Sequence, residues 1–162
     1  GITTDLGILV NNHMQTSAPQ IYAAGDVAEH YDLARKKRWV NAIWPEAATQ
    51  GQVAGLNMAG RRVHYPGSVS RNIIRIFDLD VMCAGIANPP EEQTFSVLQD
   101  VNPREKTYRK LVFNQDRLVG VVAVNAVENT GALLALIRQN RPWPGKKEAL
   151  LDPGFGPGHM SR

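Results

Sequence analysis

The amino-acid sequence changes character around Tyr65-Pro66-Gly67-Ser68, and this change constrains the fold more than any other feature. Before it, short apolar runs alternate with polar turns and one helix-like stretch. After it, apolar residues recur at the spacing of successive strands. A chain of 162 residues is long enough for two small domains. We therefore predict an α+β chain with domains over 1–65 and 66–145 and a flexible tail over 146–162, where Gly and Pro are frequent.

The first domain contains a continuous apolar run, Ile21-Tyr22-Ala23-Ala24, which ends at Gly25-Asp26. A run without alternation is typical of a strand buried on both faces in an α/β layer. The following stretch, 27–41, has no clear period, and we predict a loop that exposes the basic residues 35–38. A helix over 45–59 is predicted next, because Pro45 suits a first helical position and Gly60 a stop.

The second domain carries the pattern of an antiparallel sheet. We predict one long or bent strand over 73–82 and a meander of three strands over 95–101, 107–113 and 118–124. Residues 114–117 suit a hairpin loop between the last two. An amphipathic helix over 131–141 is expected to cover the sheet.

Several classes of function are disfavoured by composition. Cys83 is the only cysteine, so the chain holds no cysteine pair, and its apolar neighbours predict a buried structural thiol. The four histidines lack metal-ligand spacing, and we predict no metal site. The net charge is +3, and the basic clusters lack interleaved aromatic residues, so nucleic-acid binding is not expected. Without a long apolar run or a leader peptide, we predict a cytoplasmic protein that binds no membrane.

A strand that ends in Gly25-Asp26 places a carboxylate at the carboxyl edge of a sheet, where cofactors bind in α/β folds. Glycine allows a ligand to lie against bare backbone. A hydrogen bond from a hydroxyl to such a carboxylate contributes about 1.5 to 3 kcal/mol. Asp26 is therefore a candidate acceptor for the hydroxyls of a sugar or polyol.

Residues 16–26 read T-S-A-P-Q-I-Y-A-A-G-D. This segment resembles the second FAD-binding signature of the pyridine-nucleotide-disulfide oxidoreductase superfamily, T-x-x-x-x-I-Y-A-x-G-D. The flanks 7–10 and 44–51 resemble the branch with NADH oxidases, rubredoxin reductases and the flavoprotein portion of NADH-dependent nitrite reductase. The resemblance covers residues 1–65 well and continues more weakly through the second domain.

The resemblance implies that residues 1–65 are the end of an α/β FAD-binding domain. Gly25 would admit the cofactor's backbone, and Asp26 would bind the ribityl chain of the flavin. The helix that begins near Pro45 would point the free N–H groups of Glu46, Ala47 and Ala48 at the pyrimidine edge of the ring. A helix N-terminus favours adjacent negative charge, as on reduced flavin, by about 0.3 to 1 kcal/mol. No catalytic residue is assigned.

The Gly-rich loops that hold the rest of FAD and NAD(P)H in this superfamily do not occur in the sequence. We therefore expect a fragment whose missing N-terminal FAD and NAD domains bind NAD(P)H as co-substrate. The full-length protein would pass hydride from NAD(P)H to FAD and electrons to an unidentified acceptor. The chain alone is expected to bind FAD weakly or not at all and to be inactive.

Alternatives stay open at this point. A Gly-Asp pair after an apolar strand is common, so by itself it need not mark a cofactor site. Trp44 is either close to the flavin or packed at a domain seam. Gln50 suits a solvated helix face. An alternative function is that residues 67–145 act as a non-catalytic interface or homodimerisation module. A sheet covered by one helix on one face leaves the other face or an edge in need of a partner. The signature could also be accidental in an unrelated α+β domain.

Overall fold

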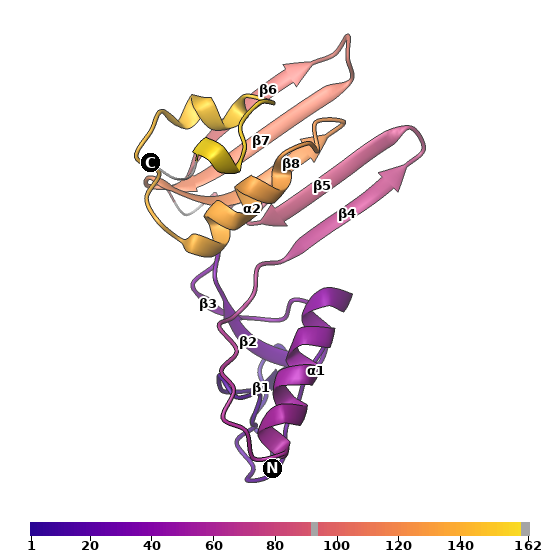
Figure 1. Ribbon diagram of the computed structural model, residues 1–162, viewed down its shortest axis with the longest axis vertical. Helices are drawn as coiled ribbons and strands as arrows, with labels where there is room; N and C mark the ends of the chain where they lie inside the picture. Colours follow the sequence, from indigo (N-terminus) through magenta and orange to yellow (C-terminus); the bar gives the residue numbers. More distant parts are fainter. Residues whose placement is uncertain (92–93, 160–162) are drawn as a thin grey trace. The chain divides into compact units, whose positions relative to one another are not determined.

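The computed structural model describes residues 1–91 and 94–159 and divides into two compact units, Gly1–Ser70 and a second unit that begins at Arg71 (Figure 1). The α+β class predicted from the sequence is confirmed. The first unit contains β1 (Ile8–Leu9), β2 (Ala28–Asp32), β3 (Lys37–Trp39) and α1 (Trp44–Met58). The second contains β4 (Arg71–Ile76), β5 (Leu79–Gly85), β6 (Ser96–Asn102), β7 (Thr107–Asn114), β8 (Arg117–Val124), α2 (Thr130–Gln139) and two 3-10 helices, η1 (Lys147–Leu151) and η2 (Pro157–His159).

The three strands of the first unit form a sheet in the order β1-β2-β3, with β1 parallel and β3 antiparallel to β2. The prediction of a loop over 27–41 is therefore wrong. Strand β2 buries charged residues with partners: Glu29 Oε2 accepts from the Gly7 N–H at 3.1 Å, and Asp32 Oδ1 accepts from the Arg35 N–H at 2.7 Å. Because these partners satisfy inward-facing polar groups, no apolar alternation marks the strand.

The predicted strand over 21–24 is also wrong. These residues form one isolated antiparallel bridge, between Gln15 and Tyr22, and Ile21 is 46% exposed. Two backbone hydrogen bonds tie the segment to 14–16, from Thr16 N–H to Ile21 O and from Ala23 N–H to Met14 O. No neighbouring strand within the residues that the structure describes forms a continuous ladder of hydrogen bonds with residues 21–24 on either side. This apolar run is therefore not a strand.

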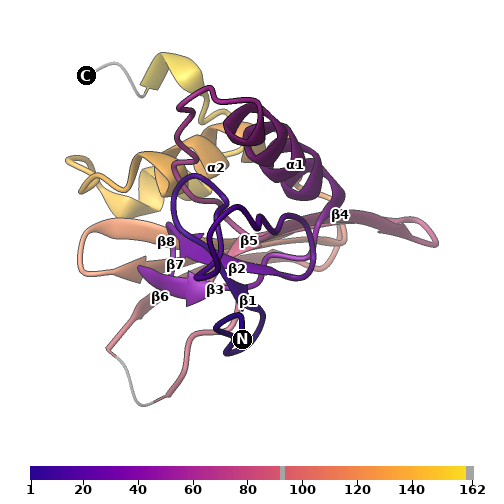
Figure 2. The same cartoon turned by 90° about the horizontal axis from the view of Figure 1, so that it is seen from below.

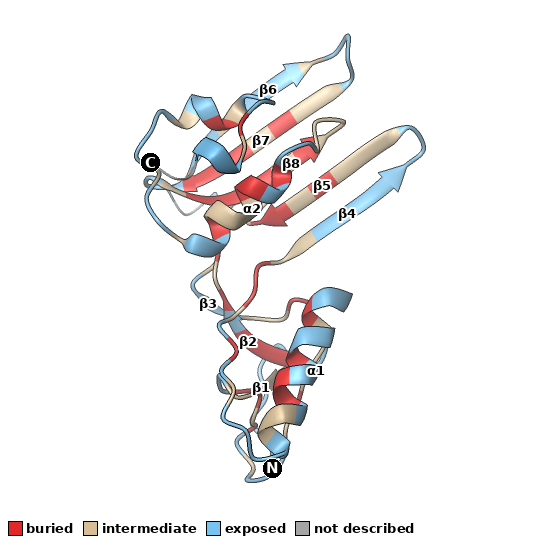
Figure 3. Ribbon diagram, in the orientation of Figure 1, coloured by how far each residue is buried: buried red, intermediate tan, exposed pale blue. Residues whose placement is uncertain are grey.

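The core of the first unit lies beneath α1 (Figure 3). The sequence predicted this helix to within one residue at each end. Val53 and Ala54 of the helix pack in one buried cluster with residues from the segments before and after it, namely Val10, Met14, Ala23, Ala28 and Tyr65. Tyr65 and Ser68 are buried, so the proposed linker at 65–68 is packed within the first unit.

The second unit is built on a five-stranded antiparallel sheet in the order β4-β5-β8-β7-β6. The predicted meander of β6, β7 and β8 is confirmed, as is the covering helix, because α2 and the 3-10 helices lie on one face of the sheet (Figure 2). The predicted single strand over 73–82 is instead the hairpin β4–β5, which turns at Phe77 with φ of +55°. A turn of this conformation usually contains Gly or Asn. Because Phe77 is apolar, the sequence pattern did not reveal that two strands meet there.

Two features stabilise the second unit where sequence patterns gave little indication. Gly85 and Gly120 are paired across β5 and β8, and a Cβ atom at either one would overlap a carbonyl oxygen of the neighbouring backbone. The C-terminal segment buries Leu150 and Phe155 although Gly and Pro are frequent there. Helix η1 contacts β6 and β7, which gives this Gly- and Pro-rich segment an apolar anchor.

Candidate functional site

The Gly25–Asp26 turn packs against the first turns of α1. Gly25 has φ of +81°, a conformation that glycine adopts readily, and a Cβ atom placed on it would lie 3.5 Å from Ala47 Cβ. Its N–H donates to Gln50 Oε1 at 2.8 Å. The structure thus brings together two segments that the sequence singled out separately.

The start of α1 differs from the expectation of three free N–H groups. The N–H groups of Glu46 and Ala47 both donate to the Ile43 carbonyl, at 3.1 and 3.0 Å. Ile43, the N-cap residue, has an extended backbone, so its carbonyl closes the first turn of the helix. The prediction is therefore wrong for Glu46 and Ala47.

Around this contact, several side chains remain exposed. Asp26, Pro45 and Ala48 are exposed, and Trp44 is 82% exposed. The surface of this unit therefore offers a carboxylate acceptor, which suits the hydroxyls of a polyol, and a large exposed aromatic face, which suits a ring. Only Ala47 lies within 4 Å of a Cβ atom placed on Gly25, so the backbone there is open to a ligand, and the residues are compatible with a flavin.

Glu46 points into the core instead of toward this surface. It is 5% exposed, and the Tyr65 hydroxyl donates to its Oε2 at 2.6 Å. Burial raises the pKa of the Tyr65 hydroxyl, and the hydrogen bond to the Glu46 carboxylate raises it further. The tyrosine therefore stays a donor at neutral pH and satisfies a buried acid in the first turn of α1.

A buried polar network behind the site escaped the sequence analysis. Asn41 Nδ2 donates to Asp32 Oδ2 at 2.8 Å and to Ser68 Oγ at 2.7 Å, and Ser68 Oγ lies 3.2 Å from His30 Nε2. Because three of these residues lie in the stretch predicted to be a loop, only the density of polar residues there could have given a signal. Gln50 was also misjudged, since it is 1% exposed and not solvated.

Within residues 1–91 and 94–159, no group of three or more His, Cys, Asp or Glu side chains could hold a metal ion. Cys83 is partly exposed on β5, which corrects the prediction of a fully buried thiol. None of the helices in the described part of the chain has the length and apolar character needed to span a bilayer.

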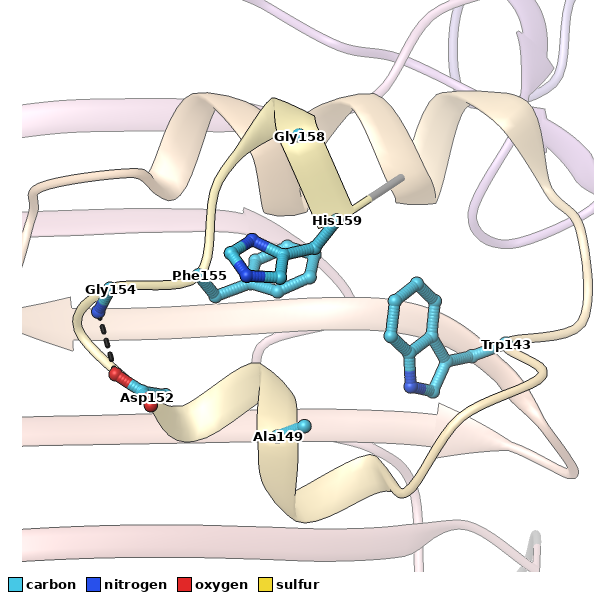
Figure 4. A pocket seen from close by; sticks show the side chains of 7 residues that line it. All are labelled: Trp143, Ala149, Asp152, Gly154, Phe155, Gly158 and His159. Atoms are coloured by element: carbon cyan, nitrogen blue, oxygen red, sulfur yellow. Dashed lines mark hydrogen bonds between the residues drawn. The ribbon is translucent and has the colours of Figure 1, made fainter. Parts of the chain in front are cut away.

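The second unit contains a cavity of about 800 Å³ between η1 and η2, lined by Trp143, Ala149, Asp152, Gly154, Phe155, Gly158 and His159 (Figure 4). Its polar groups already bind their own backbone: Asp152 Oδ1 accepts from the Gly154 N–H at 2.7 Å, and Trp143 Nε1 donates to Lys146 O at 3.1 Å. Phe155 stacks on the His159 ring. These contacts explain how the segment packs and point to no chemistry.

Comparison with protein families assigns both units. Residues 1–51 match the model of pyridine nucleotide-disulphide oxidoreductases, and residues 71–141 match the rubredoxin NAD+ reductase C-terminal domain. The second match begins at residue 71, where the second compact unit also begins.

Individual relatives agree with these matches. The chain is 33% identical over 132 residues to the CoA-dependent NAD(P)H sulfur oxidoreductase of Pyrococcus furiosus, covering 74% of this chain and 30% of that protein. It is 36% identical over 100 residues to the NADH-rubredoxin oxidoreductase of Clostridium acetobutylicum, covering 61% and 25%. The crystal structure of NADH:rubredoxin oxidoreductase from Clostridium acetobutylicum superposes with a TM-score of 0.68 at 27% identity, covering 93% of this chain and 38% of that one. The chain belongs to the pyridine nucleotide-disulphide oxidoreductase family.

Proposed function

We propose that this chain supplies part of the flavin site of an FAD-dependent NAD(P)H oxidoreductase. The remaining FAD- and NAD(P)H-binding domains of that enzyme would be partners outside these residues. When bound, FAD accepts a hydride from NAD(P)H and passes electrons to an acceptor, which the residues described here do not identify. By itself the chain is expected to bind FAD weakly or not at all and to be inactive, and a cytoplasmic location stays a prediction.

One observation carries the proposal: the FAD signature at 16–26 ends in a turn that packs directly on α1. Asp26 would accept hydrogen bonds from the ribityl hydroxyls, and Gly25 would let the cofactor approach the backbone. Trp44 would cover one side of the ring. The proposed flavin-binding set is Gly25, Asp26, Trp44, Pro45 and Ala48; Glu46 and Ala47 leave the predicted set because both N–H groups donate to the Ile43 carbonyl and the Glu46 carboxylate faces the core.

The test is Asp26→Ala in the full-length protein, compared with Asp5→Ala, which removes another exposed carboxylate of the same unit. Loss of a hydrogen bond to a charged group costs about 1.5 to 3 kcal/mol, which weakens FAD binding roughly 10- to 150-fold. Titration of apoprotein with FAD, followed by fluorescence, measures the change. Equal FAD affinity and NAD(P)H oxidation in Asp26→Ala would contradict the assignment.

A second candidate function, a homodimerisation module, is favoured by the sheet of the second unit. Strand pairing aligns one apolar residue from every strand in a single row, namely Ile74, Val81, Val124, Tyr108 and Val101. Paired residues project from the same face of a sheet, and the neighbouring Arg109 projects to the face covered by α2 and η1. The row therefore lies on the face opposite those helices, with Ile74 52% and Val101 58% exposed.

A further inference from the structure

Gln50 connects the two segments of the proposed flavin site. Its side chain is 1% exposed, and its Oε1 accepts the Gly25 N–H at 2.8 Å. The bond spans 25 residues of sequence and joins the middle of α1 to the turn that carries Asp26. Without it, a partly buried N–H in a left-handed turn would have to find another acceptor.

Tyr65 fixes the orientation of Gln50. Since Gln50 Oε1 accepts from the Gly25 N–H, the remaining donor of the amide is its NH2 group, and the interaction of Gln50 with the Tyr65 hydroxyl lowers the pKa of that hydroxyl. The same hydroxyl donates to Glu46 Oε2. Tyr65 is 3% exposed, and its backbone N–H donates to Asn12 O at 2.7 Å, so the ring cannot move freely.

The chemistry of this cluster is more specific than packing requires. An apolar core would stabilise α1 without any risk of unsatisfied polar groups, and buried polar groups are destabilising unless every partner is in place. Here polar interactions run in order from Glu46 through Tyr65 and Gln50 to the Gly25 N–H, with hydrogen bonds at 2.6 Å and 2.8 Å at the two ends. Such a series fixes one orientation of the Gly25–Asp26 turn relative to the helix start.

We propose that Gln50 and Tyr65 are positioning residues that hold the Gly25–Asp26 turn in the geometry that binds flavin. This inference rests on the proposed function. Neither side chain touches the cofactor in this role; both act through the backbone of Gly25 and the first turns of α1.

The experiment compares Gln50→Leu and Tyr65→Phe with two controls in the full-length protein. Gln52→Leu makes the same chemical change at an exposed position of α1. Val53→Ala removes buried apolar volume from the same helix, so it lowers stability without touching the series of hydrogen bonds. The readouts are FAD affinity of the apoprotein, the flavin absorbance spectrum and the unfolding midpoint.

Gln50→Leu is expected to weaken FAD binding roughly ten-fold, as loss of one buried hydrogen bond predicts, and Tyr65→Phe to weaken it by a smaller factor. Neither control should change FAD affinity, even where Val53→Ala lowers the unfolding midpoint as much. If Gln50→Leu does not fold, Tyr65→Phe decides by the same comparison.

Two results would overturn the inference. FAD bound with unchanged affinity and spectrum by both Gln50→Leu and Tyr65→Phe would remove the positioning role and leave the proposed function intact. An unchanged full-length protein that binds no FAD would remove the proposed function and this inference together. In the 162-residue chain, a Gly25 amide resonance that moves in Gln50→Leu and not in Gln52→Leu supports the bond itself.

Discussion

At the scale of single residues, the most unusual group is His30. It is 2% exposed, its Nε2 contacts Ser68 Oγ, and its Nδ1 has no hydrogen-bond partner among the described residues. Burial lowers its pKa below the usual value, and Arg38 acts in the same direction, while the carboxylates of Glu46, Asp32 and Glu29 oppose both. The ring is therefore neutral in the folded chain at neutral pH.

A pH dependence of stability follows. Because the pKa of His30 is lower in the folded state, the unfolded state takes up a proton first as pH falls below about 6.5. Stability present above that pH is lost as pH falls toward the folded-state pKa. We expect His30→Gln to flatten the decline in urea midpoint between pH 7 and pH 5, and the exposed His64→Gln to leave it unchanged. Parallel pH profiles for His30→Gln and the unchanged chain would refute this.

At the scale of elements, Arg109 fastens the C-terminal segment to the sheet. Its guanidinium Nη1 donates to Leu151 O and Asp152 O at 3.1 and 3.2 Å, and Nη2 donates to Ala126 O at 2.7 Å. Arg109 is 3% exposed although it projects from β7, and burial lowers its pKa. One side chain thus satisfies carbonyl groups before α2 and at the end of η1.

Replacing the Arg109 side chain should weaken the attachment of two segments to the sheet, the one before α2 and the one at the end of η1. Arg109→Met keeps apolar length but leaves several buried carbonyl groups without a donor, which costs about 2 to 3 kcal/mol of unfolding free energy. Lys110→Met, the adjacent change on the opposite face of β7, is the matched control and should cost far less. Urea unfolding measures the difference, and limited proteolysis should cut Arg109→Met earlier near residue 150. Equal unfolding free energies for the two variants would show that Arg109 does not fasten the segment.

The elements themselves show what sequence patterns can and cannot reveal. Helix α1, helix α2 and the β7–β8 hairpin were predictable because local signals mark them: Pro45 at a helix start, an apolar stripe, and a run of four polar residues, 114–117, that contains the turn. The β2–β3 hairpin was not, since the buried Glu29 and Asp32 give no apolar pattern, and the partner of Glu29, the Gly7 N–H, lies far away along the chain. The candidate site followed the same rule. Asp26 was found from a local motif, whereas the roles of Gln50 and Tyr65 depend on long-range hydrogen bonds.

At the scale of the whole molecule, the apolar row across the second sheet predicts self-association. Burial of apolar surface contributes about 25 cal/mol per Å², so a face with Ile74 and Val101 exposed favours a second copy of the same face.

Sedimentation velocity at increasing protein concentration tests this prediction. The unchanged chain should shift toward a dimer, and Ile74→Lys should weaken dimerisation at least about ten-fold, since a buried unpaired charge opposes association. Met58→Lys, at an exposed apolar position of the first unit, should leave the dimer unchanged. A chain that stays monomeric at every concentration would exclude the module.

The paired glycines at 85 and 120 bear on how variation in this family will be interpreted. A side chain at either position would collide with the backbone of the neighbouring strand, so nearly every substitution should be rejected there. Alignments of close relatives should then show both positions as invariant, as though they took part in chemistry. Their invariance would reflect backbone geometry alone, and a survey that ranks residues by conservation would place them beside Asp26 for an unrelated reason.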